Sequence, residues 1–150
     1  MAQLVATRKN FENAFKKHYE CYKTFLQDAH KKSKRLLLVY AVENGLKCLL
    51  LKKICKKDSN DLQHHSDYVK YMKYDGHDIK GMLAWAGAGG QFSVKTFKAG
   101  NKDEHNVAPH LLHQFWRYGL DTKDVSEEED VERTLSLIAE WINCKLRDKL

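Results

Sequence analysis

The chain has 150 residues, of which 43% are hydrophobic and 31% charged, and its net charge is +6. This length and balance fit one globular domain that folds without a metal or a disulfide. No apolar run approaches the roughly 18 residues of a membrane span, and the first residues lack the apolar core of a signal peptide. We therefore expect residues 1–150 to form a single cytoplasmic domain with no membrane partner.

The positive charge favours an anionic partner such as RNA, DNA or a nucleotide. Lysines spread along the outer faces of amphipathic helices would give the same charge, so both interpretations stay open. The four cysteines contain no Cys-x-x-Cys pair, which gives no support to a zinc ribbon or a redox motif. We expect buried free thiols at these positions, which are Cys21, Cys48, Cys55 and Cys144.

The first half of the chain predicts two long helices. Apolar residues recur with the helical period from Asn10 to about Ala29. Ser33 can cap a second helix, which runs to about Cys55 and is apolar on most sides. Such a helix belongs at the centre of a bundle or in an oligomer interface. Residues 56–76 are polar and too numerous for an ordinary bundle loop, which predicts an insert.

A short helix is predicted next, from His77-Asp78 to about Trp85. We interpret His77-Asp78 as the N-cap of this helix with an imidazole ring beside it. The glycine-rich residues 86–90 end it. They lack the strand and helix context of a phosphate-binding loop, so we interpret them as a flexible turn. Residues 91–98 alternate like a short strand or an extended loop.

Two further helices are predicted near the end of the chain. Pro109 suits the first turn of a helix that Gly119 ends. Ser126 and Glu129 form a capping box for the last helix, whose apolar stripe is buried. The sequence therefore predicts an all-α bundle of four to five helices, with the insert between the second and the third.

The predicted fourth helix holds residues suited to phosphate chemistry. His113 and Arg117 are four residues apart and share one helix face. Arg117 can hold a phosphate, His113 can exchange a proton, and Trp116 can stack on a base. The alternative is a partly exposed helix with Trp116 in the core. The candidate catalytic residues are His113 and Arg117, and the candidate residues for binding a nucleic acid or nucleotide are Trp116, His110, His77 and Lys47.

Eight histidines raise the question of a metal site. His110 and His113 share a helix face, and His64, His65 or His105 would have to supply further ligands. No His-Glu-x-x-His motif occurs, and no carboxylate lies at helical spacing beside the pair. We therefore expect no metal and no cofactor.

Glu43 interrupts the apolar second helix. A buried carboxylate needs a partner, and Lys47 follows one helical turn later. We expect a structural ion pair between Glu43 and Lys47. The alternative places Glu43 at a dimer face, together with Tyr40.

Three segments of the chain carry a resemblance to a known family. The first is Tyr40–Leu50, with the sequence YAVENGLKCLL, which is similar to the signature helix of HEPN domains (higher eukaryotes and prokaryotes nucleotide-binding). Gly76–Leu83, GHDIKGML, resembles the segment that opens the next helix, and the closing helix Val131–Leu146 fits the same pattern. The resemblance covers the chain from about Phe11 to Leu146. It implies an up-and-down bundle of four or five helices, a homodimer, and a role in a prokaryotic defence, toxin–antitoxin or nucleotidyltransferase-linked system.

Many HEPN proteins are metal-independent RNases with an Arg-x4-6-His motif. No histidine follows Arg8, Arg35, Arg117 or Arg133 at that spacing. The resemblance therefore implies first a non-catalytic dimeric module that binds RNA, a nucleotide or a cognate protein. One alternative is an RNase toxin that uses His113 with Arg117. Another is a structural subunit that packs on a partner through the second helix.

Overall fold

The computed structural model describes residues 4–25, 30–100 and 105–148. It is mostly helical, which confirms the predicted class, but a small antiparallel sheet corrects the all-α expectation. The elements are α1 (Arg8–Thr24), α2 (Lys31–Ile54), α3 (Ser59–Gln63), α4 (Ser66–Tyr71), α5 (Ile79–Trp85), β1 (Phe97–Ala99), β2 (His105–Val107), the 3-10 helix η2 (Pro109–Leu111), α6 (Leu112–Arg117) and α7 (Val125–Arg147). Among the described helices, none has the length and apolarity needed to span a membrane.

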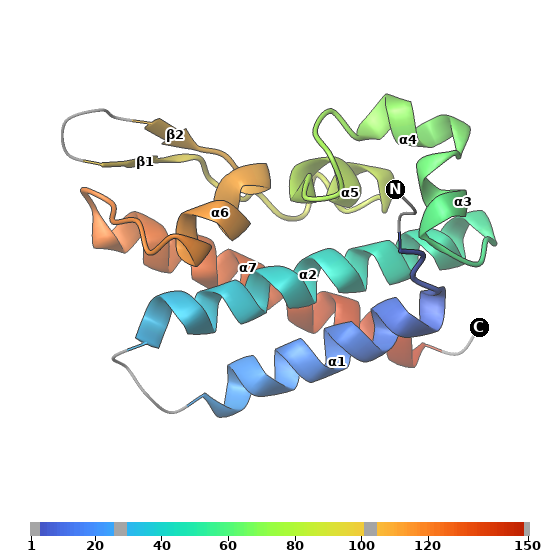
Figure 1. Cartoon of the computed structure of the whole chain (residues 1–150), viewed down its shortest axis with the longest axis horizontal. Coiled ribbons are helices and arrows are strands. Elements are labelled where there is room, and N and C mark those ends of the chain that lie inside the picture. Colours follow the sequence, from blue (N-terminus) through green and yellow to red (C-terminus); the bar gives the residue numbers. More distant parts are fainter. Residues whose placement is uncertain (1–3, 26–29, 101–104, 149–150) are drawn as a thin grey trace.

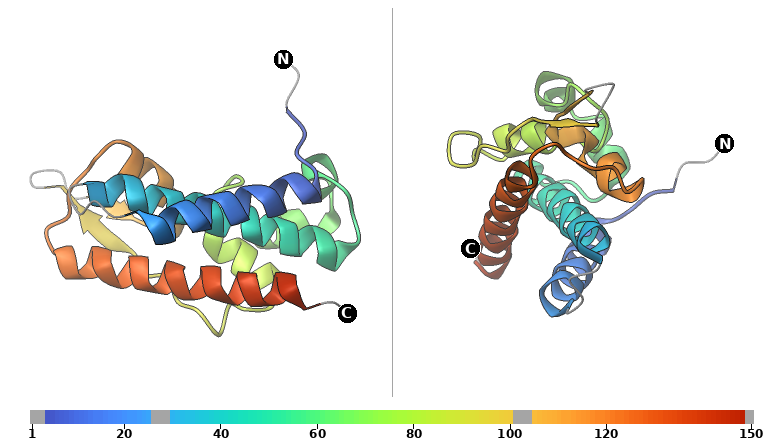
Figure 2. Two further views of the ribbon diagram at one scale, coloured as in Figure 1. Left: turned by 90° about the horizontal axis from the view of Figure 1, so that it is seen from below. Right: turned by 90° about the vertical axis from the view of Figure 1, so that its left-hand side faces the viewer.

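The long helix α2 lies between α1 and α7, and the short helices α5 and α6 pack against another side of it (Figures 1 and 2). α1 and α2 form an antiparallel pair. α7 runs in the same direction as α2, because Arg35 near the start of α2 pairs with Glu132 near the start of α7, while Gly45 lies against Ile142 further along both helices. The up-and-down layout that the HEPN resemblance implies stays a prediction.

α2 is buried within the chain because α1, α5, α6 and α7 pack against it. Leu38 and Leu46 have no exposed surface. The tightest crossing is at Gly45, where an added Cβ would lie 2.7 Å from Ile142 and 2.8 Å from Phe15. The apolar character that suggested an oligomer interface is therefore satisfied inside the molecule.

The starts of the first two helices show which side chains cap them. Thr7 caps α1 through a capping box with Asn10, three residues before the predicted start. The predicted extension of this helix falls partly on Leu26–Ala29, which lies outside the described residues. α2 begins at Lys31 after His30, whose side chain makes no capping bond, so Ser33 lies in the first turn and is not the cap.

The helices near the C-terminal end also differ in their first turns. The helix predicted from Pro109 is present, but its first turn is the 3-10 helix η2. Its end is confirmed, since Gly119 has a φ of +68° that favours glycine. Asp124 caps α7 by accepting a bond from the Ser126 backbone N–H, so the predicted capping box at Ser126 is wrong. Asp124, two residues earlier, supplies the capping oxygen, and Ser126 lies within the first turn of the helix.

About half of the insert of residues 56–76 is helical, in α3 and α4. Asp58 caps α3, and the His65 ring caps α4 by accepting from the Asp67 backbone N–H. The predicted cap of α5 is confirmed, because Asp78 accepts a bond from Gly81. Residues 91–98 were expected to form a short strand or an extended loop; residues 92–96 have no regular structure, and the strand β1 begins only at Phe97 and pairs with β2.

All four cysteines are free thiols, as predicted. Only Cys48 is buried, whereas Cys21, Cys55 and Cys144 are exposed. The predicted burial was therefore wrong for three of them. A position within an amphipathic helix does not by itself place a residue on the inner face.

Candidate functional site

Three polar side chains from distant parts of the sequence meet beside α2. Glu43 comes from α2, His77 from the turn before α5, and His113 from α6. One oxygen or ring nitrogen from each lies within 4.8 Å of those of the other two. Glu43 Oε2 is 2.9 Å from His77 Nδ1, and the His77 ring stacks on His113 with 3.7 Å between ring centroids. We call these three residues the histidine cluster.

Two of the three residues in the histidine cluster are buried, and their hydrogen bonding is incomplete. Glu43 is 4% exposed and His113 is 6% exposed. Among the described residues, Glu43 Oε1 and His113 Nδ1 have no hydrogen-bond partner. A buried polar atom without a partner costs about 1–3 kcal/mol, and few occur in a native fold. Two of them in one cluster point to a site that has a function beyond packing.

Two aspartates hold His77 in position. Asp78 is 4% exposed, and its carboxylate accepts bonds from the backbone N–H groups of Gly81 at 2.9 Å, Lys73 at 3.0 Å and Tyr74 at 3.4 Å. Asp75 Oδ1 accepts a bond from the His77 backbone N–H at 3.1 Å. The turn that presents His77 to Glu43 is therefore fixed at both ends.

The two histidines differ in their electrostatic environment. The hydrogen bond to Glu43 raises the pKa of His77, although burial opposes this effect. Burial lowers the pKa of His113, and the neighbouring His77 charge lowers it further. Environments that separate the pKa values of adjacent groups are typical of functional sites.

We expect NMR titration in the presence of EDTA to show the His77 ring titrating above about 6.5, the ordinary histidine pKa, and the His113 ring below it. His77 then stabilises the fold at acidic pH, and this contribution is lost as the pH rises through its folded-state pKa. His113 acts oppositely, since it favours unfolding as the pH falls below about 6.5. Glu43→Gln should lower the pKa of His77, because it removes the carboxylate that raises this pKa. Equal titration of both rings in the folded wild type would contradict this prediction.

The surroundings of the histidine cluster correct one predicted contact. Lys47 was expected to pair with Glu43, but the hydrogen-bonded partner of Glu43 is His77. The turn before α5 brings that ring closer than the lysine on the same helix. Burial lowers the pKa of Lys47, and the Glu43 charge opposes the shift. His110 lies outside the cluster and stacks on Tyr74, with 3.5 Å between the ring centroids.

The other predicted site residues lie apart from the histidine cluster. The Arg117 guanidinium donates to the Tyr118 hydroxyl at 3.1 Å and lies over that ring. It therefore influences His113 through its charge, without a hydrogen bond between the two. Tyr40 is half-buried and its ring contacts that of His18, with 5.8 Å between centroids.

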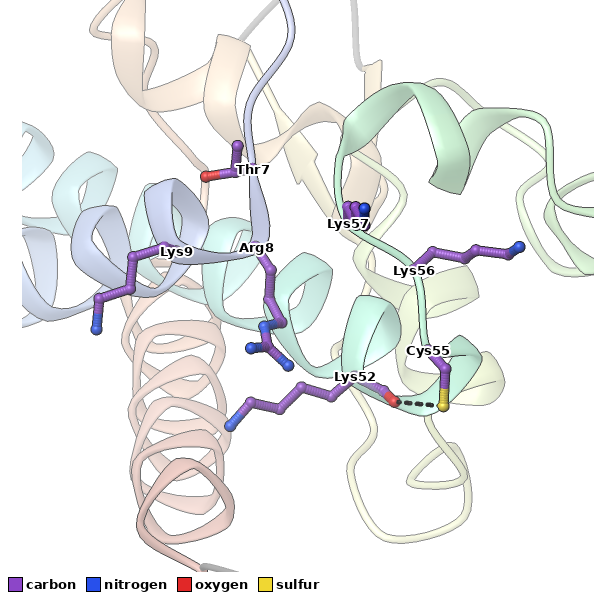
Figure 3. A pocket seen from close by; sticks show the side chains of 7 residues that line it. All are labelled: Thr7, Arg8, Lys9, Lys52, Cys55, Lys56 and Lys57. Carbon is purple, nitrogen blue, oxygen red and sulfur yellow. Dashed lines mark hydrogen bonds between the residues drawn. The ribbon is translucent and has the colours of Figure 1, made fainter.

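A second candidate site is a basic pocket between the start of α1 and the end of α2 (Figure 3). It has a volume of about 490 Å³, and none of its lining residues is acidic. Figure 3 shows the Arg8 guanidinium and the Lys52 ammonium facing the same space, whereas Lys56 extends away from them. The lining residues are Thr7, Arg8, Lys9, Lys52, Cys55, Lys56 and Lys57.

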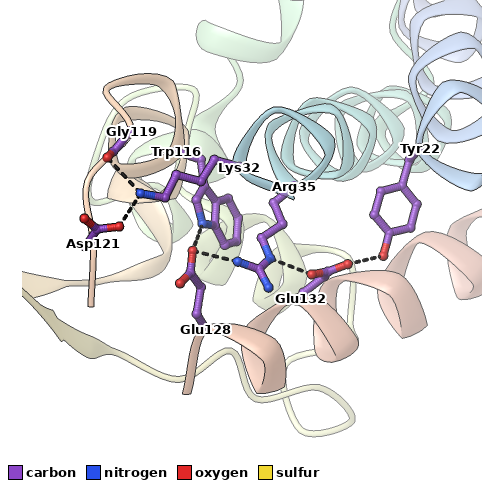
Figure 4. A network of polar contacts seen from close by, with 8 residues as sticks. All are labelled: Tyr22, Lys32, Arg35, Trp116, Gly119, Asp121, Glu128 and Glu132. Carbon is purple, nitrogen blue, oxygen red and sulfur yellow. Dashed lines mark hydrogen bonds and ion pairs between the residues drawn. The ribbon is translucent and has the colours of Figure 1, made fainter. Parts of the chain in front are cut away.

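A polar network at the other end of the molecule explains Trp116 (Figure 4). Trp116 is 2% exposed, and its Nε1 donates to Glu128 at 2.6 Å. Arg35 pairs with Glu128 at 2.9 Å and with Glu132 at 2.6 Å, and Tyr22 donates to Glu132 at 2.6 Å. The ring of Trp116 is therefore enclosed in the core, which is the alternative interpretation of this helix, and it has no free face for stacking on a base.

Comparisons with protein-family models, curated proteins and solved structures found no match. The resemblance to HEPN domains therefore stays a prediction.

Sequence reasoning named Glu43, His77 and His113 separately and did not bring them together. Their separation along the chain hides the contact. The one signal in the sequence was Glu43, because a lone carboxylate in an apolar helix needs a partner from elsewhere in the chain. The basic pocket was missed as well, although Arg8-Lys9 and the lysines around Cys55 are visible as local charge clusters.

Proposed function

We propose that this chain is an RNA-binding module that holds phosphate groups in the basic pocket. The supporting observation is that Arg8 and Lys52 face one concave space with no acidic residue lining it. Two like charges directed at one space repel each other, and a bound anion removes that cost. The net charge of +6 favours the approach of a polyanion.

The cationic side chains of the basic pocket differ in whether a carboxylate already pairs with them. Lys9 pairs with Glu12 at 3.1 Å. Within the described part of the chain, Arg8 and Lys52 make no ion pair with a carboxylate. Arg8 can grip a phosphate through two parallel hydrogen bonds, and Lys52 adds a point charge. These two residues are therefore the predicted centre of the RNA contact.

The test is fluorescence anisotropy with a labelled single-stranded RNA at several salt concentrations. Arg8→Ala with Lys52→Ala should weaken binding about tenfold or more and reduce the slope of log K against log salt by about 1.4, which corresponds to two lost phosphate contacts. The matched control is Lys17→Ala with Arg133→Ala, which removes the same charge from surface positions outside the pocket. The control should bind nearly as well as the wild type.

Equal losses in the two double variants would refute the basic pocket as the binding site. Gel analysis of the same RNA in EDTA separates binding from cleavage. Cutting that is lost in His113→Gln would support the alternative of a metal-independent RNase acting through His113 and Arg117. We expect intact RNA.

The homodimer, the cognate protein partner and the defence or toxin–antitoxin setting are further parts of this proposal that rest on the HEPN resemblance. Light scattering tests the dimer directly. Since α2 is covered within the chain, a dimer would have to use another surface.

A further inference from the structure

We propose that Glu43, His77 and His113 bind one divalent transition-metal ion, with Zn²⁺ as the preferred ion. This goes beyond RNA binding and is independent of it. Glu43 and Lys52 are nine residues apart on α2, which places them on opposite sides of the helix and about 14 Å apart along its axis. The histidine cluster and the basic pocket can therefore be tested separately.

The donor atoms have the chemistry of a zinc site. Two imidazoles and one carboxylate are common ligands of Zn²⁺ and also suit Fe²⁺ or Co²⁺. The three donors already lie within 4.8 Å of one another. Bound Zn²⁺ keeps each ligand about 2 Å away, so side-chain movements on the order of 1 Å would complete the site.

The unpartnered atoms are a second, independent observation. Glu43 and His113 are more than nine-tenths buried, and each has one polar atom that lacks a partner among the described residues. A metal ion would take a lone pair from each. It would also replace the Glu43–His77 hydrogen bond with one bond from each residue to the shared ion, and the proton of that hydrogen bond would be released to solvent.

The surroundings of the cluster suit an ion that enters from solvent. The His77 side chain is 35% exposed, which gives an entry path on one side. Asp75 fixes the His77 backbone, a form of support from outside the ligand set that orients metal ligands. Lys47 and Arg117 bring positive charge nearby, and Glu43 and Asp75 offset it. Three protein ligands leave one position for water or a substrate.

The test uses the full chain, treated with EDTA and desalted. Titration with Co²⁺ should produce the visible absorption bands of a bound ion with low coordination number, at one ion per chain, and Zn²⁺ should displace it. Isothermal titration calorimetry gives the Zn²⁺ affinity. Glu43→Gln and His113→Gln should each weaken binding at least about tenfold, as loss of a ligand requires. His64→Gln, at an exposed histidine outside the cluster, is the matched control and should bind like the wild type.

Circular dichroism establishes whether each variant is folded. If both buried variants unfold, His77→Gln on the partly exposed ring gives the deciding comparison. Absence of stoichiometric Co²⁺ and Zn²⁺ binding in the folded wild type would overturn the proposal, as would equal affinity in the folded cluster variants. Anisotropy with RNA in EDTA keeps the two proposals distinct, because RNA binding should persist without metal.

Discussion

Arg35→Met should destabilise the fold by about 3–5 kcal/mol, which is the usual cost of removing one partner from a buried ion pair. Arg35 is 5% exposed and is shared by Glu128 and Glu132. Methionine keeps most of the side-chain volume but leaves Glu128, which is 4% exposed, without a compensating cation. Urea unfolding followed by circular dichroism measures the change in the free energy of unfolding.

Lys32→Met is the matched control for this prediction. Lys32 pairs with Asp121, whose side chain is 88% exposed. An exposed pair contributes about 0–1 kcal/mol, so this variant should lose little stability. Adding Glu128→Gln to Arg35→Met should restore part of the lost stability, since it removes the unpaired charge. Similar losses in Lys32→Met and Arg35→Met would show that the buried network has no special role.

Asp78→Ala should cost about 3 kcal/mol, more than an ordinary helix cap. A typical N-cap aspartate contributes about 0.5–2 kcal/mol through one or two amides. Asp78 accepts from three backbone N–H groups and is buried, so its removal leaves several donors unsatisfied. Thermal and urea unfolding measure the loss.

Asp58→Ala is the corresponding control, because Asp58 also caps a short helix but is only half-buried and accepts from the Asp61 backbone N–H alone. It should cost about 1 kcal/mol. Asp78→Ala should also move the His77 resonances, since it releases the turn that presents this ring to Glu43. Unchanged His77 resonances would show that the turn is held by other contacts.

The long helices were predictable because each has a strong periodic pattern. α1 and α7 have one apolar face, and α2, whose nearly continuous apolar run predicted either the centre of a bundle or an oligomer interface, lies at the centre. The sheet was harder to predict. β1 and β2 have three residues each and depend on pairing with each other, so their local patterns carry little information. Two caps were misplaced, by three residues at α2 and by two at α7, because the local sequence marks the exact end of a helix only weakly.

The candidate sites were less predictable than the helices. His113 and Arg117 were linked by helical spacing, yet the structure directs Arg117 to Tyr118 and His113 to His77. Spacing along one helix predicts a shared face but not which distant side chain approaches it. Trp116 shows the same limit, because its partner Glu128 belongs to another helix.

The parallel arrangement of α2 and α7 has a consequence for the order of assembly. α1 and α2 follow each other closely and can dock early through local contacts. The partner of Arg35 is Glu132, 97 residues later in the chain, and the partner of Tyr19 is Glu140, 121 residues later. Neither contact can form before α7 docks. Until α7 docks, the Arg35 guanidinium lacks both of its carboxylate partners and is hydrated by water. In a chain that ends before α7, the face of α2 that normally packs against α7 would therefore stay exposed to solvent, where chaperones can bind it.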